Sequence, residues 1–313
     1  MPPRKIILDT DPGQDDAVAI MLALASPGEI EVLGITTVAG NVPLHVTSDN
    51  ALKICELVGK PPVKVFAGCD RPLKRELVTA EHIHGPSGMS GTNLPDPRIA
   101  LQDGHAVDFI IETLRQEPSG TITLCPVGPL TNIATAFNKA PDIIDKVQEI
   151  VLMGGACFQL GNTTPAAEFN IYVDPDAADI VFRSGVPIVA MPLDVTYKAR
   201  VTSAHTDAFR ALQSSVGVAV SQMTGGPERY NVPKYGGEGT PLHDPCVIAY
   251  LIQPSLFSGQ HVHVAIETQS ELTVGMTVVD WWHTTGRDTN AYVVGDIDAD
   301  GFFSLLTERL AQL

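Results

Sequence analysis

Four carboxylates lie within eight residues of one another in the stretch Asp9-Thr10-Asp11-Pro12-Gly13-Gln14-Asp15-Asp16, which we call the acidic turn. Two carboxylates about 4 Å apart repel each other by roughly 4 kcal/mol at an effective dielectric constant near 20. Such a cluster needs either protonation or a bound cation, and a hard divalent ion with oxygen ligands meets this need. The sequence therefore predicts a cation site at this turn.

Two other interpretations of the acidic turn are possible. In the first, Asp9 caps the turn, and Asp15 and Asp16 form a solvated helix start, where the helix dipole favours each charge by about 0.3–1 kcal/mol. In the second, the turn binds phosphate. A phosphate cradle needs glycines and free backbone N–H groups, whereas this turn has one glycine and a proline without a donor.

The segments around the acidic turn would hold it in place. Residues 5–8 have the length and β-branched content of a short buried strand, and residues 17–25 are rich in helix formers. The same alternation continues along the chain. It predicts strands at 31–38, 63–67, 121–127, 149–153 and 186–193, and helices at 44–58, 106–114, 130–137 and 174–184.

Strands that alternate with helices predict an α/β fold with a doubly wound, mostly parallel sheet and helices on both faces. Ligands of such sheets bind beyond the carboxyl ends of the strands, where the acidic turn and Asn41 would lie. Near the carboxyl terminus, residues 262–266 and 273–279 predict antiparallel strands, and residues 301–313 predict a helix. No repeat or linker interrupts the chain, so we expect residues 1–313 to form a single domain.

Two stretches rich in proline and glycine break this rhythm, at 69–103 and 224–241. Long irregular runs in compact domains are usually functional, so we expect mobile active-site loops there. His82 and His84 of the first loop could ligate a metal, but no cysteine or third histidine lies nearby to complete the site. Between the loops, residues 206–223 carry a helical apolar stripe that we assign to the core.

Composition excludes several classes of function. A chain of 313 residues that is 44% hydrophobic and 18% charged is globular and long enough to bury a large core. Its net charge of −16 disfavours nucleic acid and anionic membranes as partners, and no apolar run approaches the roughly 20 residues of a membrane span. Five cysteines without a paired spacing indicate reduced thiols. Because the first strand begins almost at the start of the chain, we expect no signal peptide and a cytoplasmic location.

The acidic turn resembles the amino-terminal signature of the nucleoside hydrolases, the calcium-dependent family of the inosine–uridine type. Further motifs similar to those of the family follow in the family's order and cover most of the chain. They are Val38-Ala39-Gly40-Asn41, Val127-Gly128-Pro129-Leu130-Thr131-Asn132, Val151-Leu152-Met153-Gly154-Gly155, Ala167-Glu168-Phe169-Asn170 and His243-Asp244. The resemblance implies hydrolysis of the N-glycosidic bond of ribonucleosides such as uridine, cytidine and inosine, as in nucleoside salvage.

By the same resemblance, Ca²⁺ would be held by Asp11, Asp16, Asp244 and the backbone carbonyl of Val127, together with water and the ribose hydroxyls. Asp11 would also take the proton of the attacking water. The residues that match ribose-binding positions of the family are Asp15, Asn41, Met153, Asn162, Glu168 and Asn170. Carboxylate and amide oxygens suit this task independently, because the breaking bond leaves positive charge on the ribose ring.

The departing base gains negative charge and needs a hydrogen-bond donor. His243 is the candidate, with the helix-capping role of a histidine beside a structural Asp as its alternative. A histidine at this position resembles family members of pyrimidine or broad preference, whereas the purine-specific branch uses an aromatic cage. Tyr235 and His84 match positions in the two loops that reach the base or the sugar.

Alternatives to this hypothesis remain open at the level of sequence. The enzyme could prefer purines, or the chain could be a phosphatase with Asp9 or Asp11 as nucleophile, or a nucleoside-binding protein without turnover. The resemblance also implies a homo-oligomer, a dimer or a tetramer. Trp281 and Trp282 fit either a packing corner or a subunit contact.

Overall fold

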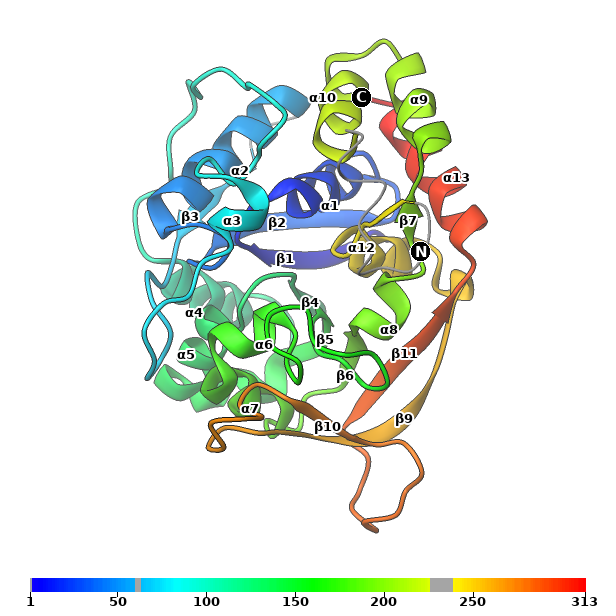
Figure 1. Ribbon diagram of the computed structural model, residues 1–313. Helices are drawn as coiled ribbons and strands as arrows, with labels where there is room; N and C mark the ends of the chain where they lie inside the picture. The colour runs from blue at the N-terminus through cyan, green and yellow to red at the C-terminus, as the bar shows by residue number, and fades with distance from the viewer. Residues whose placement is uncertain (1, 60–62, 226–238) are drawn as a thin grey trace.

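The computed structural model describes residues 2–59, 63–225 and 239–313, and at its centre lies a nine-stranded sheet (Figure 1). From one edge to the other its strands are β10 (Thr277–Asp280), β9 (Phe257–Ile266), β11 (Ala291–Ile297), β6 (Ile188–Met191), β5 (Val147–Met153), β4 (Ile122–Pro126), β1 (Arg4–Thr10), β2 (Ile30–Thr37) and β3 (Val65–Ala67). Neighbours from β11 to β3 run parallel, whereas β9 pairs antiparallel with β10 and β11. The predicted mostly parallel sheet in a single domain is confirmed.

Helices cover both faces of the sheet, as predicted, and each face has its own apolar core. The first face carries α1 (Gln14–Leu24), α2 (Leu44–Val58), α9 (Ser203–Ala211), α10 (Ser215–Thr224), α12 (Pro245–Ile252) and α13 (Ala299–Leu310). The second carries α4 (Ala106–Gln116), α5 (Thr131–Lys139) and α7 (Pro175–Phe182). Side chains of β1 alternate between the cores, with Ile6 and Leu8 in the first and Ile7 in the second.

Shorter elements connect these layers. Most lie around the carboxyl ends of the parallel strands, whereas the 3₁₀ turn that precedes β5 lies at the amino end of that strand. They are α3 (Glu81–His84), 3₁₀ turns at Pro141–Lys146 and Pro254–Leu256, α6 (Phe169–Val173), α8 (Leu193–Thr196), and a two-stranded sheet of β7 (Arg200–Val201) and β8 (Thr240–Pro241). None of the helices in the described ranges is both long enough and apolar enough to cross a membrane. All five cysteines are free.

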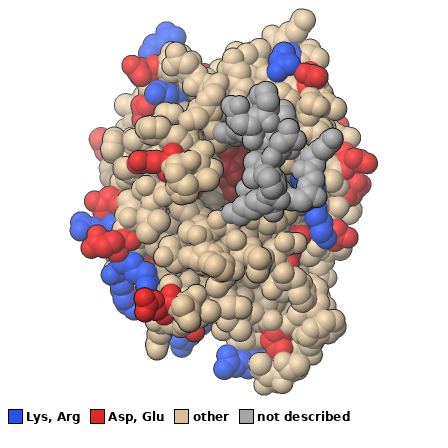
Figure 2. All heavy atoms as spheres, in the orientation of Figure 1, with Lys and Arg blue, Asp and Glu red and all other residues tan. Residues whose placement is uncertain are grey.

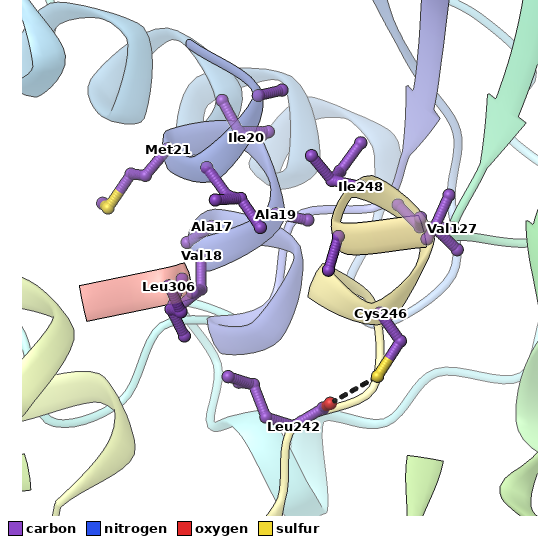
Figure 3. Close-up of a cluster of buried hydrophobic side chains, with 14 of the residues drawn as sticks. Ala17, Val18, Ala19, Ile20, Met21, Val127, Leu242, Cys246, Ile248 and Leu306 are labelled. Atoms are coloured by element: carbon purple, nitrogen blue, oxygen red, sulfur yellow. Dashed lines mark hydrogen bonds between the residues drawn. The ribbon is translucent and has the colours of Figure 1, made fainter. Parts of the chain in front are cut away.

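Packing between α1 and α12 has a direct consequence for the acidic turn (Figure 3). Alanine and valine side chains of α1 are fully buried, as are Cys246 and Ile248 of α12. The Cys246 thiol donates to the carbonyl of Leu242 at 3.5 Å and joins the first turn of α12 to the segment before it. The amino ends of the two helices lie together, since carboxylate oxygens of Asp15 and Asp16 in α1 and of Asp244 before α12 come within 4.8 Å of one another.

Three features differ from the sequence-based prediction. Residues 206–223 form two helices rather than one, because Gln213 adopts a left-handed φ of 57° and Ser214 then caps α10 through the Gly217 N–H. The predicted core assignment of Phe209 and Val216 is nonetheless correct. Strand β11 was not predicted, and α3 lies inside the loop expected at 69–103. Most of the loop expected at 224–241 lies outside the described residues.

Candidate active site

The acidic turn connects β1 to α1, and Asp16 organises it from the first turn of the helix. Its carboxylate accepts hydrogen bonds from the Thr10 hydroxyl at 2.6 Å and from the Gly13 N–H at 3.0 Å, the second of which closes a capping interaction. The side-chain amide of Asn41 donates to the same carboxylate at 3.2 Å. Asp16 therefore fixes the conformation of the turn as well as adding charge to it.

Asp11 is fully buried at the end of this strand, between two glycine-containing motifs. A Cβ atom at either Gly40 or Gly128 would collide with the Asp11 carboxylate, so only glycine permits this approach. One oxygen, Oδ2, accepts from the Asn41 backbone N–H at 2.6 Å. The other, Oδ1, is buried without a hydrogen-bond partner among the residues that the structure describes.

Asp244 reaches the acidic turn from 228 residues farther along the chain than Asp16. It precedes α12, and its carboxylate, with those of Asp15 and Asp16, places three oxygens within 4.8 Å of one another. Burial and repulsion from the neighbouring acids raise the pKa of Asp244 well above its ordinary value. Burial and then repulsion from Asp16 do the same to the pKa of Asp11. The site thus concentrates negative charge that a proton or a cation must neutralise.

Asp9, the first acid of the turn, points away from the other three acids. Strand alternation directs Asp9 to the same side as Ile7, where the Thr36 hydroxyl and the Asn132 amide donate to its Oδ1 at 2.5 and 2.7 Å. Burial raises the pKa of Asp9 to about 7. Asp9 supports the sheet behind the site and does not line the cavity in front of it.

A cavity of about 410 Å³ opens over the acids, within the range of small-molecule sites. Figure 2 shows acidic side chains recessed in a hollow of this face. Of the residues predicted from the sequence, those that line the cavity are Asp15, Asn41, His84, Val127, Met153, Asn162, Glu168, Asn170, His243 and Asp244. The structure therefore brings together side chains from nearly every predicted motif.

Glu168 and Asn170 form one wall of the cavity, at the start of α6. Glu168 accepts backbone N–H groups of Gly155 and Asn170 at 3.0 Å each, and burial raises its pKa to about 7. The Asn170 amide nitrogen donates to the carbonyls of Val127 and Met153, at 2.8 and 3.2 Å. Since the nitrogen is committed to these carbonyls, the amide oxygen of Asn170 is the atom available to a ligand.

Three histidines, His82, His84 and His243, line the cavity. The His243 Nδ1 is 2.7 Å from the hydroxyl of Thr196, and the Tyr197 ring lies 5.8 Å from the imidazole. His84 approaches from α3, together with His82. None of the three belongs to a metal-ligating group within the described ranges, so a metal site at His82 and His84 is not supported. Tyr235 lies outside the described residues.

Sequence reasoning missed two residues that position these groups. Gln14 is 4% exposed, lines the cavity and bonds to His84, and its place between the acids of the turn was the available signal. Thr196 is fully buried in α8 beside His243. The two are 47 residues apart in sequence, and no local pattern indicates the contact.

The described residues fit a hard divalent cation. Asp15, Asp16 and Asp244 supply oxygens that are already close together, and Asp11 Oδ1 is a buried carboxylate oxygen without a donor. The carbonyl of Val127 accepts one bond from Asn170 and retains a second lone pair. An oxygen-only donor set with several carboxylates is the type that Ca²⁺ and Mg²⁺ prefer.

Comparisons with known proteins agree with this geometry. The model of the inosine-uridine preferring nucleoside hydrolase family matches residues 6–304. The chain is 52% identical to an uncharacterized protein of Schizosaccharomyces pombe over 99% of both chains. It is 47% identical to the pyrimidine-specific ribonucleoside hydrolase RihA of Salmonella schwarzengrund over 97% of both chains.

Solved structures give the same result. The purine-preferring ribonucleoside hydrolase of Gardnerella vaginalis superposes with a TM-score of 0.89 at 35% identity, with 98% of each chain covered. The matched region includes every motif of the cavity described above. The chain thus belongs to the inosine-uridine preferring nucleoside hydrolase family and is a hydrolase that acts on the N-glycosyl bonds of nucleosides.

Proposed function

We propose that the protein is a Ca²⁺-dependent ribonucleoside hydrolase that converts uridine, cytidine and inosine to free base and ribose. The observation that carries the proposal is the convergence of Asp15, Asp16 and Asp244 beside the buried Asp11, at the floor of a cavity with His243 at its rim. A family that accepts several bases needs its chemistry to act on the sugar. The acids lie where a ribose could contact them.

In this proposal Asp11, Asp16, Asp244 and the carbonyl of Val127 hold the ion. A bound divalent cation lowers the pKa of water and binds vicinal hydroxyl groups, which are the two functions the reaction requires. Asp11 takes the proton of the attacking water. The Oδ1 atom of Asp11 supports the role, because this oxygen is buried and accepts no hydrogen bond within the described residues, so it is available to a proton.

The remaining walls hold the ribose and stabilise the transition state. Asp15, Asn41, Met153, Asn162, Glu168 and Asn170 are the proposed ribose ligands, and all of them line the cavity. Cleavage of the bond to the base builds positive charge on the sugar ring. The Glu168 carboxylate and the Asn170 amide oxygen are fixed by backbone contacts, so they can stabilise this charge without reorganising.

His243 donates a hydrogen bond or a proton to the departing base. We propose a pyrimidine preference because His243 precedes Asp244, and because the relative RihA is named pyrimidine-specific. Trp281 and Trp282 are absent from the described lining of the cavity and offer no aromatic cage there. A purine preference is the second candidate, since the structural relative from Gardnerella vaginalis is named purine-preferring. Tyr235 and His84 are proposed to contact the base or sugar.

We further propose a cytoplasmic homo-oligomer, a homotetramer or a dimer, that serves nucleoside salvage. Exposed apolar side chains support self-association, since Phe158, Leu160 and Trp282 are 63%, 75% and 75% exposed. The Phe158 ring packs edge-on against Trp281, with ring centroids 5.3 Å apart. Light scattering coupled to gel filtration would give the mass directly.

A panel of five nucleosides tests the function. Release of reducing sugar from uridine, cytidine, inosine, adenosine and guanosine would be measured with Ca²⁺ and with a chelator. We expect turnover of uridine and cytidine to exceed that of the purine nucleosides, and to stop in the chelator. Faster release from adenosine or guanosine would favour the second candidate, and no release from any nucleoside would refute the proposal.

A further inference from the structure

The side-chain amide of Gln14 connects the acidic turn to the segment 79–92, which contains α3 and which we call the rim segment. Its Nε2 donates to the carbonyl of Ser90 at 2.8 Å, and its Oε1 lies 3.0 Å from Nδ1 of His84. The first residue of α1 is therefore bonded to two residues of the rim segment, which lie 70 and 76 positions farther along the chain. Gln14 is almost fully buried, so these contacts are screened from water.

The two contacts together determine which atoms carry the hydrogens. The carbonyl of Ser90 can only accept, so the amide nitrogen of Gln14 must face it and the amide oxygen must face the imidazole. An amide oxygen can only accept as well. The Nδ1 of His84 must therefore carry a proton, and in the neutral ring Nε2 is then an acceptor.

His84 lines the cavity and is half-buried. Its ring packs against Gly13, where the position of a Cβ atom would lie 3.0 Å from Nδ1, so the side of the ring that carries Nδ1 faces the turn. Across residues 2–59, 63–225 and 239–313, no protein group bonds to Nε2. Nε2 is consequently the ring nitrogen that a ligand can use.

We propose that Gln14 is a positioning residue that holds His84 in its Nδ1–H tautomer, so that Nε2 accepts a hydrogen bond from a hydroxyl or N–H group of the bound nucleoside. The identity of the ligand rests on the proposed function, whereas the tautomer does not. Histidines that bind metal ions are held in one tautomer in the same way, by a hydrogen bond from their second ring nitrogen to a neighbouring residue. Because Nε2 of the neutral ring can only accept, and the neighbouring floor is acidic, this part of the cavity favours a hydrogen-bond donor on the substrate.

Asn50 provides a matched control for Gln14. Its amide nitrogen donates to the carbonyls of Pro12 and Ser87 at 2.9 and 2.8 Å, so it also joins the acidic turn to the rim segment. It does not bond to the imidazole of His84. Asn50→Ser should loosen the rim segment without changing the tautomer of His84. Gln14→Met should loosen the rim segment and also change the tautomer.

The test is ¹⁵N NMR of protein that carries ¹⁵N-labelled histidine, recorded at a pH at which the imidazole is neutral. The His84 signals are identified by their loss in His84→Gln. We expect Nδ1 of His84 to be protonated in the parent protein and in Asn50→Ser. In Gln14→Met the proton should shift to Nε2. In Gln14→Glu it should stay on Nδ1, because a carboxylate still accepts it. An Nε2–H tautomer in the parent, an unchanged tautomer in Gln14→Met, or the same shift in Asn50→Ser would overturn the proposal.

Kinetics give a second readout. Since one hydrogen bond to substrate is lost, KM for uridine should rise about tenfold in Gln14→Met, with a smaller change in kcat. Gln14→Glu keeps the acceptor for Nδ1 but loses the bond to the Ser90 carbonyl, so it should recover only part of the affinity. If the tautomers are as expected but no nucleoside is hydrolysed, the proposed function fails and the tautomer assignment stands. If turnover is normal but Nδ1 is unprotonated, the positioning role fails alone.

Discussion

The floor and the rim of the cavity are built in different ways. At the floor, Asp15 and Asp244 line the cavity, and the buried carboxylates of Asp11 and Asp16 lie next to them, fixed by β1 and α1. At the rim, His84 belongs to a four-residue helix in an irregular segment, and the neighbouring Ile83 is 63% exposed. The floor is thus part of the core and the rim is an addition to it. We infer that the floor performs the reaction on the sugar, which all substrates share, and that the rim adapts to the base.

Removal of an acid from the floor should have the largest effect. Asp11→Ala should lower kcat for uridine by about 10³-fold or more, because it removes both a proton acceptor and a ligand of the ion. Steady-state release of reducing sugar measures this loss. Asp207→Ala, which removes an exposed carboxylate paired with Arg210, is the matched control and should change little. Equal losses in the two variants would contradict the division between floor and surface.

Glu168 in the wall should make stability depend on pH. Its pKa is raised from 4.5 to about 7 by burial, so the folded state holds this proton more tightly than the unfolded chain does. The resulting stabilisation is complete below about pH 4.5 and is lost as the pH rises through about 7, a change of about 3 kcal/mol. Urea unfolding in chelator, at pH 4.5 and 7.5, should show this additional loss in the parent protein but not in Glu168→Gln. Equal losses of unfolding free energy in the parent protein and in Glu168→Gln would show that Glu168 ionises normally.

The effect of substituting His243 should depend on the leaving group of the substrate. His243→Ala should reduce kcat/KM for uridine by about 10²-fold, since it removes a donor to the base. For a nitrophenyl riboside, whose leaving group departs as an anion and needs no proton, kcat/KM should fall much less. An equal loss on both substrates would assign His243 to folding or to the sugar instead.

Substitution of Thr196 should have the smallest effect on activity. Thr196→Val removes the hydroxyl that contacts His243 Nδ1 and leaves the shape of the side chain nearly unchanged. We expect kcat/KM for uridine to fall about fivefold to tenfold, as for the loss of one hydrogen bond. The loss should vanish when the substitution is combined with His243→Ala. If the two losses multiply instead, Thr196 acts independently of the imidazole.

Much of the floor could be predicted because its signals are local. The strand, turn and helix around Asp11 are recorded in consecutive residues, and so is the cap of α7, where Asp174 accepts from the Ala177 N–H at 3.0 Å and Pro175 follows it. Helix α2 begins and ends at the predicted residues. Local spacing and capping chemistry were sufficient in these cases.

Features that depend on tertiary contacts could not be predicted in the same way. The direction of Asp9 depends on Thr36 and Asn132, which come from other elements. The break between α9 and α10 depends on a single left-handed residue, Gln213, inside a continuous apolar stripe. Strand β11 joins β6 to β9. It is partly exposed and contains Gly295 and Asp296, residue types that are disfavoured in strands, so its own sequence carries a weak signal.

The central claim is that acids of the acidic turn and Asp244, far apart in sequence, bind one hard cation on which turnover depends. The most direct measurement is uridine hydrolysis by metal-stripped protein during a calorimetric titration with CaCl₂, compared with the same titration of Asp244→Asn. We predict one ion bound per chain, activity that rises in proportion to occupancy, and much weaker binding in the variant. Full turnover before any calcium is added, or equal affinity in the variant, would contradict the account.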